Sequence, residues 1–114
     1  MHTVVETPEF LRRAKDCGVS EDERKEIVIR IAADPQGGDP IPGTGGARKI
    51  RFAGPGQGKQ GSYRIITFYS GADIPVFLLS MFAKNEKSDM SQGEKNELRK
   101  LLKVLPESYR RARK

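Results

Sequence analysis

Residues 47–83 contain three successive segments with the residue pattern of β-strands, and this feature most constrains the fold. The three segments are residues 47–53, 63–69 and 75–83. The first alternates apolar and basic residues, the second is aromatic and β-branched, and the third is almost continuously apolar. Residues 36–46, rich in Gly and Pro, are predicted to be a surface connection into the first strand. The short joins at 54–62 and 70–73 favour antiparallel hairpins and hence a meander.

Two helices are predicted before this sheet. Thr7 is a suitable N-cap, Pro8 suits the first helical position, and Gly18 follows the end of the first helix. Ser20 and Glu23 have capping-box spacing and therefore predict the start of a second helix. Its apolar stripe comprises Ile27, Val28, Ile31 and Ala32.

A third helix is predicted after the sheet. Ser91 and Glu94 form a second capping-box pattern, and a leucine stripe follows at Leu98, Leu101, Leu102 and Leu105. Pro106 is expected to end or bend this helix, which leaves residues 107–114 as a frayed basic tail. Residues 3–6 are β-branched and predict either an edge strand or an ordered leader. The predicted order is therefore (β)ααβββα.

Length and composition favour one domain. The chain has 114 residues, of which 36% are hydrophobic, enough for one modest core. We therefore expect a single α+β domain over residues 1–114. No apolar run is long enough for a membrane span, and the first ten residues lack a signal-peptide pattern. Cys17 is the sole cysteine, which excludes an intramolecular disulfide and suits a reducing compartment. We expect a cytoplasmic protein.

Charge is distributed unevenly along the chain. Residues 1–40 contain six basic and nine acidic residues, whereas residues 41–70 contain five basic residues and no Asp or Glu. Those five are Arg48, Lys49, Arg51, Lys59 and Arg64. The overall formal charge is +6. A merely solvated basic face is the simpler alternative, but this segregation favours a phosphate-bearing partner bound at the middle of the chain.

Several kinds of catalytic site are excluded or disfavoured. His2 is the only histidine, so a two-histidine ribonuclease site cannot be built and a histidine-based triad is disfavoured. One Cys and one His provide no zinc cage, and we expect neither a metal nor a cofactor. Residues 56–61 match G-x-G-x-x-G formally, but a strand rather than a helix is predicted to follow. They fit either a flexible turn or a loop that closes on phosphate.

The remaining candidates are cations on the predicted strands. Lys49 and Arg51 share one face because side chains two residues apart in a strand point the same way. Phe82 and Lys84 share a face by the same rule, and Arg64 begins the intervening strand. Lys49 and Arg51 alone would suit the ordinary polar face of a half-exposed strand. Taken together with Arg64 and Lys84, they predict an anion site, since opposed like charges are unfavourable without a bound anion.

Four motifs follow one another along the chain: DPIPGTGG at 39–46, RKIR at 48–51, GKQGSYRIITFY at 58–69 and FAKNEK at 82–87. Together they resemble the RelE/ParE superfamily of toxins from type II toxin–antitoxin systems, and specifically its HigB-like branch. It extends over most of residues 8–105. It implies a twisted antiparallel sheet of three to four strands with two N-terminal helices and a C-terminal helix.

The resemblance also implies a function. Members of this family cleave messenger RNA in the ribosomal A site and are silenced by a cognate antitoxin protein. The family's basic catalytic positions correspond to Lys49, Arg51, Arg64 and Lys84, with RNA-binding positions at Arg48, Lys59, Phe82 and Lys87. Phe82 matches an aromatic residue that holds a base. Some HigB relatives carry a catalytic histidine that this chain lacks, so their acid and base assignments do not transfer.

We hypothesise a metal-independent endoribonuclease in which the RNA 2′-hydroxyl attacks the adjacent phosphate. Arg64 would bind the phosphate, and Lys49 or Lys84 would transfer protons. Two alternatives stay open. Relatives with the same fold poison DNA gyrase by binding alone, and a plain RNA-binding module would bind without cleaving.

Overall fold

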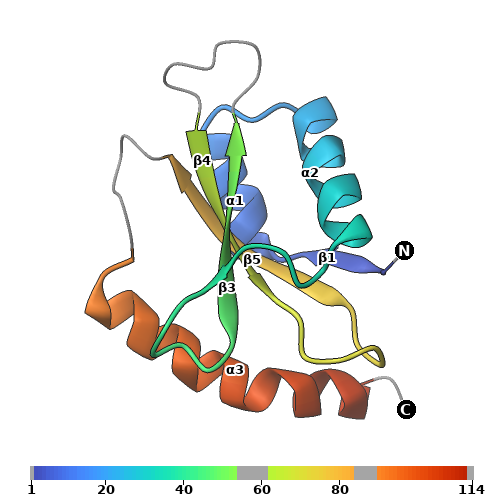
Figure 1. Ribbon diagram of the computed structural model, residues 1–114, viewed down its shortest axis with the longest axis vertical. Helices are drawn as coiled ribbons and strands as arrows, with labels where there is room; N and C mark the ends of the chain where they lie inside the picture. The colour runs from blue at the N-terminus through green and yellow to red at the C-terminus, as the bar shows by residue number, and fades with distance from the viewer. Residues whose placement is uncertain (1, 54–61, 84–89, 113–114) are drawn as a thin grey trace.

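The protein is a five-stranded sheet with helices on both faces (Figure 1). The computed structural model describes residues 2–53, 62–83 and 90–112. Its elements are β1 (Val4–Glu6), α1 (Pro8–Asp16), α2 (Glu21–Ala33), β2 (Asp39–Pro40), β3 (Ala47–Ala53), β4 (Ser62–Phe68), β5 (Val76–Ala83) and α3 (Gln92–Ala112). Helices α1 and α2 cover one face of the sheet and α3 packs against the other (Figure 1). The predicted α+β class and the order of helices are confirmed.

The sheet has the strand order β1-β5-β4-β3-β2. The predicted meander is confirmed, because β4 pairs antiparallel with both β3 and β5. The predicted antiparallel sheet of three to four strands differs from the observed sheet in two details. β1 pairs parallel with β5, and the two-residue β2 adds a fifth strand beside β3. The parallel pairing is possible because α1 and α2 carry the chain away from β1 before the meander begins.

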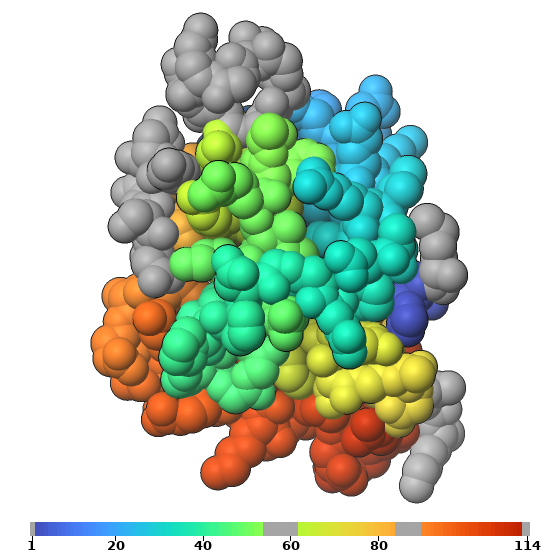
Figure 2. Space-filling model, viewed as in Figure 1, coloured from blue at the N-terminus to red at the C-terminus, as the bar shows by residue number. Residues whose placement is uncertain are grey.

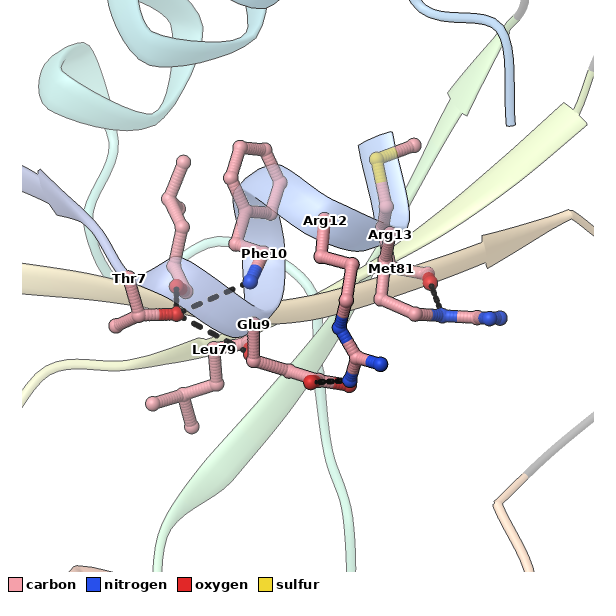
Figure 3. Close-up of polar contacts among 8 residues, drawn as sticks. Thr7, Glu9, Phe10, Arg12, Arg13, Leu79 and Met81 are labelled. Carbon is pink, nitrogen blue, oxygen red and sulfur yellow. Dashed lines mark hydrogen bonds and ion pairs between the residues drawn. The ribbon is translucent and has the colours of Figure 1, made fainter. Parts of the chain in front are cut away.

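Thr7 fixes the start of α1 and ties it to the sheet. Its hydroxyl oxygen accepts a hydrogen bond from the Phe10 amide at 3.2 Å and donates to the Leu78 carbonyl at 2.7 Å. Figure 3 shows Thr7 between the first turn of α1 and β5. Pro8 occupies the first turn, as predicted. The cap therefore sets both the beginning of the helix and its position on β5.

The capping box of α2 is also confirmed. The Ser20 hydroxyl accepts from the Glu23 amide at 3.1 Å, and the Ser20 amide donates to the Glu23 carboxylate at 2.5 Å. Ile27, Ile31 and Ala32 of the predicted stripe are buried. Ile27 and Ile31 complete a core between the two N-terminal helices and the sheet.

The connection between α2 and β3 is more ordered than predicted. Ile41 is 5% exposed and Thr44 is fully buried, so this segment is partly a packed element. The Thr44 hydroxyl donates to the Ile41 carbonyl at 2.7 Å and accepts from the Ala47 amide at 3.1 Å. These bonds close a tight turn whose base lies in the α3-side core.

Helix α3 continues past Pro106, the residue expected to end or bend it. Pro106 lies inside the helix, which extends to Ala112. The Tyr109 ring meets the Phe77 ring edge-on with centroids 5.8 Å apart, and Arg110 forms an ion pair with Asp73 at 2.6 Å. These contacts hold the last turns against the sheet, so residues 107–112 of the predicted tail are helical. Within the described ranges no helix is long and apolar enough to cross a membrane.

Candidate functional site

Three residues on neighbouring strands form a row across the sheet. Arg51 of β3 lies directly opposite Arg64 of β4, and Arg64 lies opposite Phe82 of β5. Lys49 lies opposite Ile66, two residues further along the same strands. Because side chains alternate between faces, these four positions share the face on which Ile66 and Phe82 contribute to the α3-side core. The register thus brings Lys49, Arg51, Arg64 and Phe82 together.

The opposite face of β3 is occupied by apolar side chains. Ile50 and Phe52 are half-buried and pack against the core under α1 and α2. The guanidinium of Arg30 lies 5.2 Å from the centroid of the Phe52 ring. The alternation predicted for residues 47–53 is confirmed, and it directs Lys49 and Arg51 to the other side of the sheet.

Arg64 is the most unusual side chain of the row. It is only 9% exposed, and its Nη1 atom is buried without a hydrogen-bond partner. A buried polar group left unpaired costs about 1–3 kcal/mol, and a charged group costs more. Arg51 is exposed, and neither arginine has an ion-pair partner in the part of the chain that the structure describes. Among the described residues, the row therefore presents two adjacent guanidinium groups without a neutralising carboxylate, which favours an anionic ligand.

The Phe82 ring is buried in the core rather than exposed at the surface. It is 2% exposed and belongs to the α3-side core. It also lines a small cavity of about 230 Å³ with residues of α1, β5 and α3. That lining comprises Glu9, Arg12, Arg13, Ser80, Met81, Phe82 and Glu94. A base could stack on this ring only after the neighbouring side chains move.

Arg13 is a cation beside this cavity that the sequence did not identify. Its Nε atom donates to the Met81 carbonyl at 3.1 Å, so α1 places a guanidinium on β5 next to Phe82 (Figure 3). Arg12, one residue earlier, forms an ion pair with Glu9. Arg13 belongs to an ordinary amphipathic helix with basic residues in its last turn. No sequence pattern distinguishes it from Arg12.

Arg48, another predicted position, is not part of the row. Arg48 alternates to the opposite face of β3, where its guanidinium donates to the carbonyls of Gly37 and Gly38 at 3.2 and 3.1 Å. It therefore fastens the preceding loop. Lys59, Lys84 and Lys87 lie outside the described residues.

Tyr63 and His2 are ionisable groups that lie away from the row. The Tyr63 side chain points to the α1 and α2 face, where burial, Glu23 and Cys17 raise its pKa above the ordinary value of 10.0. His2 contacts the Tyr69 hydroxyl at 3.0 Å. Tyr69 lies five residues from Arg64, about 17 Å along an extended chain. In the described ranges no three His, Cys, Asp or Glu side chains gather as metal ligands.

Comparisons with known proteins agree with this architecture. A family described as the RelE toxin of the RelE/RelB toxin–antitoxin system matches residues 2–112. A solved structure of an Escherichia coli RelE double mutant in the free state matches with a TM-score of 0.50 and 13% sequence identity. That match covers 75% of this chain and 86% of the E. coli chain, and it supports the fold. Membership of the HigB-like branch stays a prediction. The match over nearly the whole length, on a RelE-like fold, shows that this chain belongs to the RelE family of toxins from toxin–antitoxin systems.

Proposed function

We propose that this toxin is a ribosome-dependent endoribonuclease that cleaves messenger RNA at the row formed by Arg51, Arg64 and Phe82. The observation that carries the proposal is the buried guanidinium of Arg64, which has an unpartnered Nη1 and lies directly opposite Arg51. Two guanidinium groups on one face can bind the non-bridging oxygens of a phosphodiester.

The proposed reaction is an internal displacement at phosphorus. The RNA 2′-oxygen attacks the adjacent phosphorus, and the bond from phosphorus to the 5′-oxygen of the next nucleotide breaks. The products are a 2′,3′-cyclic phosphate and a 5′-hydroxyl. Charge grows on the non-bridging oxygens in the transition state, and Arg64 stabilises it through planar, fixed donors.

Two protons must move during this step. A base removes the proton of the attacking 2′-hydroxyl, and an acid delivers a proton to the departing 5′-oxygen. Lys49, on the same face as Arg51 and Arg64, and Lys84 are the proposed carriers of these protons. The proposal requires no metal and no cofactor.

The ribosome and an antitoxin are the proposed partners. A site built from arginine and lysine has strong phosphate binding but weak acid–base catalysis, so it depends on a partner that holds the RNA in a reactive geometry. We therefore expect free RNA to be cleaved poorly and A-site messenger RNA to be cleaved well. A cognate antitoxin would protect the producing cell. Because the ribosome and the antitoxin would both be met in the cytoplasm, we expect the protein there.

Mapping RNA 5′ ends after induced expression tests the proposal. Wild-type protein should create new 5′-hydroxyl ends within translated messages. Arg64→Ala should abolish them and Arg64→Lys should restore only a small part, because an ammonium lacks the planar pair of donors. Arg111→Ala removes an exposed arginine at the far end of α3 and should retain cleavage.

Two results would contradict the proposal. Growth arrest without new RNA ends would favour a binding toxin of the gyrase-poisoning kind or a plain RNA-binding module. Unchanged cleavage by a folded Arg64→Ala protein would contradict the proposal that Arg64 lies at the site of cleavage.

A further inference from the structure

A second basic feature lies on the same side of the sheet as the row. The turn that precedes β3 and helix α3 enclose a groove of about 450 Å³, lined by Gly45, Arg99, Lys100 and Lys103. In Figure 2 the green segment before β3 lies against the orange part of α3. Three of the four lining residues are cations, and none was among the residues predicted to bind RNA.

Arg99 and Lys103 are the central pair of this groove. They are four residues apart on α3 and therefore lie on one side of the helix, one turn from each other. Both are exposed, and neither has an ion-pair partner in the described ranges. Like charges at this spacing destabilise an isolated helix. Lys100 differs, because it forms an ion pair with Glu97 at 3.7 Å.

The opposite wall of the groove is backbone. Gly45 has φ +80° and Gly46 has φ +125°, conformations that favour glycine. A Cβ atom on Gly46 would lie 3.2 Å from the Phe68 ring, so the turn sits tightly on the sheet. Gly45 itself faces Arg99, whose Cγ atom would be 3.8 Å from an added Cβ. A wall without a side chain lets an extended polymer backbone approach the cations.

Strand β3 connects the turn that lines the groove to the row. Ala47, which ends the turn, belongs to the α3-side core, and strand alternation places Lys49 and Arg51 on that same face. Ala47 and Arg51 are separated by about 13 Å of extended strand. About four nucleotides span this distance at the rise per residue of one strand of a duplex.

We propose that the groove of Gly45, Arg99, Lys100 and Lys103 is a second phosphate-binding site for the RNA backbone. It would hold RNA a few nucleotides from the bond cut at the Arg51–Arg64 row. This inference rests on the proposed function, because the row supplies the reason to expect RNA. An acidic protein segment would also be attracted by these cations, but the shared face with the row favours RNA.

The salt dependence of RNA binding tests the groove without requiring cleavage. The probe is a short RNA methylated at every 2′-oxygen, which cannot undergo internal attack. Arg99→Gln combined with Lys103→Gln should lower the steepness of log K against log salt by about 1.4, or about 0.7 for each lost phosphate contact in a single strand. The matched control, Lys15→Gln with Lys25→Gln, makes the same charge change on α1 and α2 and should keep the wild-type slope.

The outcomes of these measurements separate the hypotheses. Equal slopes for the α3 double variant and the Lys15/Lys25 control would overturn the proposal that the groove binds RNA, whatever the result for cleavage. Loss of binding to an oligoglutamate peptide, but not to RNA, in the α3 double variant would assign the groove to an acidic protein and also overturn the proposal. Arg64→Ala tests the nuclease separately, because this variant should lose cleavage while its slope falls by only about 0.7, the contribution of its own phosphate contact. Retained cleavage in that variant would reject only the reaction centre.

Discussion

Arg51 and Arg64 face each other directly across the β3–β4 pair, on adjacent strands of one sheet. Cross-strand neighbours have Cβ atoms about 4.5–5.5 Å apart, and like charges at this distance are destabilising. The free protein therefore carries a repulsive contact that a bound phosphate would neutralise. This arrangement couples the stability of the sheet to the chemistry of the proposed site.

Arg51→Gln should make the free protein more stable and less active. Removing one of the two opposed charges should raise the free energy of unfolding by about 0.2–1 kcal/mol, while cleavage falls. Urea denaturation and mapping of RNA 5′ ends measure the two effects. Arg48→Gln is the control on the same strand, and it should lower stability because Arg48 bonds two loop carbonyls. A loss of stability in Arg51→Gln would contradict the repulsion.

Phe82→Leu separates packing from recognition of a base. Leucine keeps an apolar side chain in the core, so stability should fall by about 1–2 kcal/mol. Phe77→Leu makes the same change in the same core, away from the row. If the Phe82 ring holds a base, cleavage falls far more in Phe82→Leu than in Phe77→Leu at similar stability. Equal activities would limit Phe82 to a structural role.

Thr7→Ala should destabilise the protein through the start of α1. The substitution removes the N-cap acceptor and the bond to the Leu78 carbonyl, for an expected loss of about 1–2 kcal/mol. Thr7→Ser keeps the hydroxyl and should recover most of that loss. Equilibrium unfolding in urea measures both variants. Identical stability of Thr7→Ala and the wild-type protein would show that the cap contributes little.

Tyr63→Phe should reduce the loss of stability at alkaline pH. Burial, together with Glu23 and Cys17, raises the pKa of Tyr63 in the folded protein above 10.0, so the unfolded chain ionises first. The resulting stabilisation is present below pH 10.0 and is lost as pH rises through the folded-state pKa. Unfolding free energies measured across this range should fall less steeply in Tyr63→Phe. Parallel pH profiles would contradict a shifted pKa.

Local sequence patterns predicted most of the fold because their causes are local. The hydroxyls of Thr7 and Ser20 cap helices within three residues, and the alternation at Ile50 and Phe52 needs only the period of a strand. For the same reason the pattern placed Lys49 and Arg51 on one face. Nothing in these signals depends on a distant partner.

Features that depend on distant partners were missed or mispredicted. Val4–Glu6 contains no signal that selects β5 as its parallel neighbour. Pro106 does not end α3, because Phe77 and Asp73 hold the residues that follow it. The burial of Arg64, on which the site depends, likewise arises only when β4 pairs with β3 and β5.

The parallel pairing of β1 with β5 has a consequence for the nascent chain. Thr7 bonds Leu78, a residue 71 positions later, so the N-terminal helices cannot dock until β5 has been translated. The other face must wait longer, for α3 to emerge from the exit tunnel. Contacts of such long sequence separation form slowly. The core on the face that contains the row is therefore completed only after β5 and α3 have both been synthesised.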